Sequence, residues 1–183
     1  LNGKSQSTAL KYEINDTRMQ VFLPEAIRAE GGTMQIEIDY SFSIPSYGAD
    51  RMGTLSTVNG KIYTIAQWFP KIAVYDDING WNTIPYLGPS EFYLDYGDFD
   101  VKITAPSDQI VVCSRELQNP EEVYTPLQQE RWKKAAGSDR TVMIRSASEV
   151  KEQTSRPKSK ELTWHFKMQN SRDVAWASSK AFI

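Results

Sequence analysis

Regular alternation of apolar and polar residues is the feature that most constrains the fold of this chain. Between residues 34 and 44, every second residue is apolar and each intervening residue is polar. Successive side chains of a strand point to opposite faces, so this period predicts a strand that buries one face. The same alternation recurs in four other segments, at 98–103, 162–168, 10–14 and 19–23.

These strands favour antiparallel sheets, because each long run has one apolar face and one polar face. The two shortest runs flank Asn15-Asp16, which predicts a hairpin turn. The segment from Asp76 to Tyr96 is rich in Gly, Pro and aromatic residues. We expect it to form an ordered but irregular connection.

One helix is predicted after Thr125. Thr125 can act as N-cap, Pro126 suits the first helical position, and Gln128 completes a Thr-x-x-Gln capping box. Gly137 is expected to end the helix in the left-handed conformation. The flanking residues are polar, and 149–160 reads as a mobile loop on the surface.

Together these patterns predict an all-β fold. The expected architecture is an antiparallel β-sandwich, or a curved two-sheet domain, with one short surface helix. Residues 1–183 are expected to form a single domain. The apolar run from Val174 to Ile183 leads us to expect that the parent chain continues.

Charge and hydropathy exclude two classes of partner. The formal net charge is -2, which disfavours binding to nucleic acid. No apolar run approaches the roughly 20 residues of a membrane span. The one cysteine, Cys113, ends an apolar run and is expected to be buried and inert.

The shortage of metal ligands limits the chemistry of the chain itself. It has one histidine and one cysteine, whereas a zinc site needs three or four ligands. We therefore expect no metal and no catalytic residue here. His165 lies on the polar face of its predicted strand, which indicates an exposed side chain without a catalytic role.

Acidic residues offer the remaining catalytic option. A glycosidase pair or a calcium site could draw on six carboxylates, although turn formation and a solvated strand face explain them more simply. The six are Asp76, Asp77, Glu91, Asp95, Asp98 and Asp100.

Aromatic residues leave a second function open, namely carbohydrate binding. Six of them could stack against sugars, as in a stand-alone β-sandwich carbohydrate-binding module, or they could belong to a core or an interface. They are Trp68, Tyr75, Trp81, Tyr86, Phe92 and Tyr93.

Three blocks of sequence resemble a known family. They are Tyr-Thr-Ile-Ala-Gln-Trp-Phe-Pro-Lys-Ile-Ala-Val-Tyr-Asp-Asp at 63–77, the segment 96–106, and Arg-Asp-Val-Ala-Trp-Ala-Ser-Ser at 172–179. In these blocks the chain resembles the N-terminal domain of a bacterial branch of the M1 zinc metallopeptidases, or gluzincin aminopeptidases. The likeness extends over nearly the whole chain.

The resemblance implies a non-catalytic, saddle-like β domain in a peptide-hydrolysing parent. It would pack on its own thermolysin-like catalytic domain, expected beyond Ile183, which would carry the His-Glu-x-x-His zinc site. The zinc therefore belongs to the parent and not to residues 1–183. The resemblance also suggests a bacterial parent that is exported to the periplasm or cell envelope.

The resemblance further points to Gln67, Trp68 and Phe69 as residues that line the substrate cleft. In the family, a Gln-x-Glu element reaches the active site, where the Gln lines the pocket for the first side chain and the Glu holds the free amine. Gln67 matches the Gln, but Phe69 stands in place of the Glu. A phenylalanine ring carries no charge and cannot form an ion pair with an ammonium group, which leaves that task to a glutamate of the catalytic domain.

The alternative for Gln67 and Phe69 is a strand end buried against its own domain. We also expect an exposed apolar patch where the catalytic domain would pack, near 64–96 or at the C-terminal strand, with Trp68, Phe69 and Trp176 as candidates.

Overall fold

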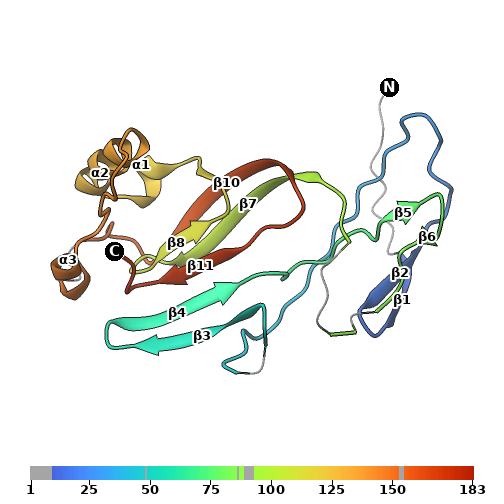
Figure 1. Ribbon diagram of the computed structural model, residues 1–183, viewed down its shortest axis with the longest axis horizontal. Coiled ribbons are helices and arrows are strands. Elements are labelled where there is room, and N and C mark those ends of the chain that lie inside the picture. The colour runs from blue at the N-terminus through green and yellow to red at the C-terminus, as the bar shows by residue number, and fades with distance from the viewer. Residues whose placement is uncertain (1–9, 48, 86, 89–92, 153–154) are drawn as a thin grey trace. The chain divides into compact units, whose positions relative to one another are not determined.

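The computed structural model describes residues 10–47, 49–85, 87–88, 93–152 and 155–183. They fall into two compact units (Figure 1). Unit 1 comprises Leu1–Ser41 and Lys71–Leu94, and unit 2 comprises Phe42–Pro70 and Asp95–Ile183. The all-β prediction is confirmed, since antiparallel strands make up most of the regular structure of the described residues and the helices are short. A single domain over residues 1–183 stays a prediction.

Among its described residues, unit 1 contains two short hairpins. Strands β1 (Lys11–Asn15) and β2 (Arg18–Phe22) pair around a turn in which Asp16 has a φ of 57°, as the Asn15-Asp16 signal predicted. Strands β5 (Tyr75–Asp76) and β6 (Gly80–Trp81) form the second hairpin. Its turn is held by Asp76 Oδ1, which accepts from the backbone N–H groups of Ile78 at 3.0 Å and Asn79 at 2.6 Å.

The described part of unit 2 contains two antiparallel sheets. One has the strand order β7-β10-β9, in which long strands β7 (Gly97–Pro106) and β10 (Glu161–Ser171) pair along most of their length. The other has the order β3-β4-β11-β8. Its strands are β3 (Met52–Thr57), β4 (Gly60–Ile65), β8 (Ile110–Cys113) and β11 (Trp176–Ser179), and β9 of the first sheet is Glu116–Leu117.

The core of unit 2 draws residues from both sheets. On β10, Trp164, Phe166 and Met168 are nearly fully buried, and the residues between them are more exposed, so the predicted alternation is confirmed. Ile103 of β7 and Val111 of β8 lie in the same cluster. Burial of such side chains contributes about 1.5–3 kcal/mol each, which makes this cluster the main source of stability.

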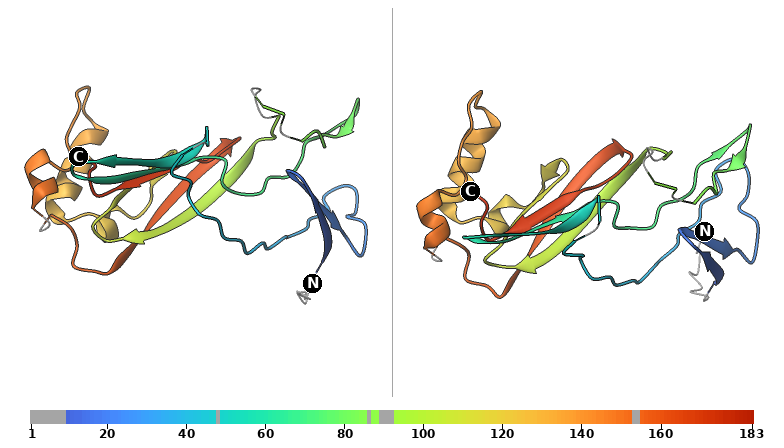
Figure 2. Two further views of the ribbon diagram at one scale, coloured as in Figure 1. Left: turned by 90° about the horizontal axis from the view of Figure 1, so that it is seen from below. Right: turned by 60° about the horizontal axis from the view of Figure 1, so that its bottom comes forward.

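Three helices lie together at one end of unit 2, the end at which the C-terminus also lies (Figure 2). The predicted helix is α2 (Pro126–Ala136), and both hydrogen bonds of its Thr125–Gln128 capping box are present. It is flanked by the shorter α1 (Pro120–Val123) and α3 (Ala147–Lys151). The helix ends at Gly137 as predicted, but the expected left-handed conformation is wrong, because the φ of Gly137 is -111°.

The strand predicted at 34–44 is absent. Within the described part of the chain these residues take part in no strand pairing, and Met34 and Ile38 remain about 40% exposed. A strand requires a neighbouring backbone, and alternation reports only which face would be buried if such a neighbour existed. The boundary between unit 1 and unit 2 also falls within this segment, after Ser41.

The mobile loop predicted at 149–160 is also wrong in part. Residues 147–151 form α3, whose Ser146–Glu149 capping box is complete, and Arg156 is only 7% exposed. Residues 153–154 lie outside the described residues. The charged composition of this segment indicated solvent exposure, but its polar groups find partners inside unit 2 instead.

Candidate functional site

The residues singled out by the family resemblance follow directly after β4. Ile65 ends this strand, 1% exposed, between Met52 of β3 and Trp176 of β11. Ala66 then donates its N–H to the carbonyl of Arg51 at 3.0 Å, which fixes the start of the turn. Gln67 has a φ of +52°, a conformation that costs a residue other than glycine about 1–2 kcal/mol. Such outliers persist only where the surroundings impose them.

Trp68 helps to hold the backbone of Gln67 in this conformation. Its indole N–H donates to the carbonyl of Val174 at 3.1 Å, and Val174 is fully buried. The ring also meets Phe69 edge to face, with centroids 5.1 Å apart. Trp68 is therefore anchored on the chain just before β11.

Phe69 points into its own unit. Its ring lies edge to face on Phe99 of β7 at 5.6 Å and packs against the buried core. This is the arrangement described above as a strand end buried against its own domain. Phe69 thus has a packing role in unit 2.

Gln67, Trp68 and Trp176 are also half-buried. The expectation that Trp68, Phe69 and Trp176 form an exposed patch is therefore wrong for these three. Exposed apolar side chains lie instead along 72–87 of unit 1, where six described residues are each more than half exposed. They are Ile72, Tyr75, Ile78, Trp81, Ile84 and Leu87.

His165 is more buried than the sequence indicated, and its side chain contacts a carboxylate. Its side chain is 24% exposed, and its Nε2 lies 2.8 Å from Asp100 Oδ1 on the neighbouring strand. Lys167 Nζ lies 3.4 Å from the other oxygen of the same carboxylate. The hydrogen bond from His165, with that from Lys167, lowers the pKa of Asp100. The cluster is a cross-strand charge pairing on the outer face of β7 and β10.

Two of the other acidic candidates, Asp76 and Asp98, accept hydrogen bonds from backbone N–H groups. Asp76 closes the β5–β6 turn, and Asp98 Oδ1 accepts from the N–H of Asn170 at 2.9 Å. Glu91 lies outside the described residues. Among the residues that are described, no group of three or more His, Cys, Asp or Glu side chains could hold a metal ion.

Two of the aromatic candidates form a pair on unit 1. The rings of Tyr75 and Trp81 are 5.2 Å apart and inclined by 70°, so this pair does not present the flat platform that favours sugar stacking. Tyr86 and Phe92 lie outside the described residues. Cys113 is half-buried, and this burial raises the pKa of its thiol to about 11, which makes it a weak nucleophile.

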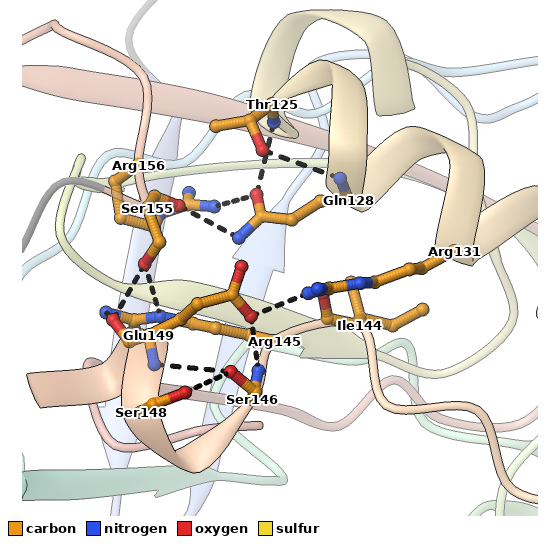
Figure 3. A network of polar contacts seen from close by, with 10 residues as sticks. All are labelled: Thr125, Gln128, Arg131, Ile144, Arg145, Ser146, Ser148, Glu149, Ser155 and Arg156. Carbon is orange, nitrogen blue, oxygen red and sulfur yellow. Dashed lines mark hydrogen bonds and ion pairs between the residues drawn. The ribbon is translucent and has the colours of Figure 1, made fainter. Parts of the chain in front are cut away.

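A network around two buried arginines was missed at the level of the sequence (Figure 3). Arg145 is 2% exposed and Arg156 is 7% exposed. Arg156 donates to the carbonyls of Ser107 and Gln109 and to Gln128 Oε1. Its guanidinium also lies over the Trp164 ring, 5.6 Å from the centroid.

Arg145 makes a comparable set of bonds. It donates from Nε to Ser155 Oγ, from Nη1 to the carbonyl of Lys180 and from Nη2 to the carbonyl of Glu149. The Glu149 carboxylate itself accepts from Ser146 N–H and pairs with Arg131 at 2.6 Å. The Ser-x-x-Glu pattern at 146–149 was the one sequence signal that could have located this network.

Compared with protein-family models, curated proteins and solved structures, the chain matches none of them. No helix among the described residues combines the length and the apolar character needed to cross a membrane.

Proposed function

We propose that this chain is the non-catalytic N-terminal β domain of an M1-like zinc metallopeptidase. In that role it would pack on the catalytic domain of its parent and contribute to the wall of the substrate cleft. The parent would use zinc to hydrolyse peptides from their amino ends, and residues 1–183 would supply no metal ligand. The proposal rests on the resemblance of 63–77, 96–106 and 172–179 to that family.

The observation that carries the packing role is the exposure of apolar side chains in unit 1. Between Ile72 and Leu87 these side chains reach 86% exposure at Ile78. The apolar face of the β1–β2 hairpin adds Tyr12 and Ile14, at 55% and 68%. A two-stranded hairpin is at best marginally stable in water, and exposed apolar surface of this kind is typical of contact with another protein domain.

The support for a cleft role is the geometry of Gln67. Its backbone is held in a strained conformation by a strand on one side and by the anchored Trp68 on the other. Such strain is found preferentially at ligand-contacting positions, and a rigid backbone would give the amide a fixed position. Phe69, which is packed on Phe99, would take no part in substrate binding.

The full-length natural gene product provides the test. We expect it to contain bound zinc and to hydrolyse aminoacyl p-nitroanilides, and we expect a chelator to abolish this activity. Gln67→Ala should change KM or the preference among aminoacyl groups, with folding retained. Gln169→Ala removes an exposed amide from β10 and serves as the matched control.

A full-length protein without zinc-dependent hydrolysis would contradict the proposal. If activity is present but Gln67→Ala behaves like Gln169→Ala, the domain assignment stands and the cleft role of Gln67 is wrong. Saturable binding of oligosaccharides by the isolated chain would favour the carbohydrate-binding alternative.

A further inference from the structure

A small cavity in unit 2 is lined by an excess of positive charge. It has a volume of about 290 Å³, at the lower limit of the roughly 300–1,000 Å³ typical of small-molecule sites. Arg145, Arg156, Lys158 and Lys180 line it, and Asp108 is the one carboxylate among its lining residues. The chain as a whole has a net charge of -2, so this concentration of cations is local.

Among the residues that the structure describes, no carboxylate contacts either of the two buried arginines. Each of their nitrogen atoms makes one hydrogen bond, and every acceptor is an uncharged oxygen of a carbonyl, hydroxyl or amide group. A guanidinium has five N–H groups, so each arginine retains two for a further acceptor. The nearby Glu149 carboxylate is occupied by Arg131 and by the N–H of Ser146.

No direct ion pair compensates the positive charges of these two buried arginines within the described residues. Burying a charge is unfavourable unless an opposite charge compensates it, and here two buried cations lie close enough to repel one another. Burial, followed by the charge of Arg145, lowers the pKa of Arg156 to about 10. Among the described residues, the negative charges of Glu149 and then Asp108 favour the charged form of Arg145, and Asp108 favours that of Arg156, but neither carboxylate is in direct contact with these guanidinium groups, and Asp108 is itself exposed.

We propose that the cavity lined by Arg145, Arg156, Lys158 and Lys180 binds a small oxyanion. The free N–H groups of the two guanidinium groups would donate to its oxygens, and the two lysines at the exposed rim would add charge. Four cations against one carboxylate favour a dianion such as phosphate over a monocarboxylate such as acetate. The site is independent of the proposed peptidase role.

Contacts with neighbouring residues hold Lys180 in place beside the cavity. Its carbonyl accepts from Arg145 Nη1 at 2.8 Å, which ties this part of the chain to the buried guanidinium. Its aliphatic stem lies beside Gly60, where an added Cβ would come within 2.5 Å of Lys180 Cγ. The lysine is thus held next to the cavity by contacts at both its backbone and its side chain.

Calorimetric titration of the full chain tests the proposal, with inorganic phosphate and acetate as probes and sodium chloride at matched ionic strength as the reference. We expect saturable phosphate binding that chloride does not reproduce. The double variant Lys158→Ala/Lys180→Ala removes both rim charges but neither buried arginine, and it should weaken phosphate binding about tenfold or more.

Lys133→Ala/Lys134→Ala is the matched control, because it removes two exposed lysines from α2, outside the cavity lining. Its affinity for phosphate should stay within about twofold of the unmodified chain. Phosphate binding that exceeds acetate binding would assign the site to phosphate groups, and equal binding would assign it to oxyanions in general, carboxylates included. Absence of saturable binding, or an equal loss of affinity in both double variants, would overturn the proposal.

Discussion

Replacing Phe69 by glutamate would introduce the side chain that the proposed relationship to M1 peptidases leads one to expect at this position, and the structure predicts that unit 2 would be destabilised. The ring is half-buried, packs against the core and meets Trp68 and Phe99 edge to face. Truncating a fully buried phenylalanine to alanine costs about 3–5 kcal/mol. For a half-buried ring with two aromatic contacts, we expect Phe69→Ala to lower the free energy of unfolding by about 2 kcal/mol.

Phe69→Glu adds the desolvation of a carboxylate against apolar neighbours, about 1–3 kcal/mol more. The total loss of about 3–5 kcal/mol is a large part of the 5–15 kcal/mol typical of whole domains. Burial would raise the pKa of the new carboxylate above its unfolded value of about 4.3. The carboxylate's part of the deficit should therefore be complete at neutral pH, should shrink as the pH falls from the raised folded-state pKa toward about 4.3, and should vanish well below 4.3, where the group is protonated in both states. The loss caused by removing the ring should remain at every pH.

Urea unfolding at 25 °C, followed by tryptophan fluorescence, measures these effects. Phe69→Leu keeps most of the apolar volume and should lose about 1 kcal/mol, so the expected order of loss is Leu, then Ala, then Glu. If Phe69→Glu unfolds at the same urea concentration as the unmodified chain, the ring does not pack as described. The residue would then be free to face a substrate cleft.

Three further outcomes follow from the described geometry. Gly60→Ala should destabilise unit 2 by about 1–3 kcal/mol in thermal unfolding, because φ is +142° and the new Cβ would clash with Lys180, whereas Gly97→Ala meets no atom within 4 Å and should be near neutral. Glu149 has a pKa lowered from 4.5 to about 2, chiefly by the N–H of Ser146 and then by the arginine it pairs with. Its stabilising contribution is therefore complete above pH 4.5 and is lost as the pH falls toward 2, and Glu149→Gln should abolish this acid-dependent loss in pH-dependent urea unfolding. Because the pKa of Cys113 is raised from 9.0 to about 11, iodoacetamide should modify it about 100-fold more slowly at pH 8 in the folded chain than in urea; equal rates would contradict its burial.

The strands and the helix that the sequence predicts correctly are those whose pattern of residues lies entirely within the segment itself. Alternation located β7 and β10, and the Thr125–Gln128 capping box located α2. Both patterns report on neighbouring residues or on one buried face, which are properties of the segment itself. The strand predicted at 34–44 carried the same signal but lacked a pairing neighbour, which no local pattern can reveal.

The candidate sites were less predictable for a related reason. Gln67 adopts a left-handed conformation usually associated with Gly, Asn or Asp, so the residue type did not predict this conformation. Arg145 and Arg156 lie in polar segments that hydropathy assigns to the surface. Their burial depends on carbonyl groups up to 49 residues away in the sequence, supplied only by the tertiary fold.

The position of β11 has a consequence for how unit 2 folds. This strand lies between β4 and β8, with Ser179 donating to the carbonyl of Lys61 across 118 positions of sequence. During synthesis on the ribosome, the edges of β4 and β8 remain unpaired until residues 176–179 emerge. Unpaired strand edges are prone to pair with other chains and aggregate. Closure over such a separation is entropically slow, so a late strand at the centre of a sheet exposes the nascent chain for longer than a late strand at its edge.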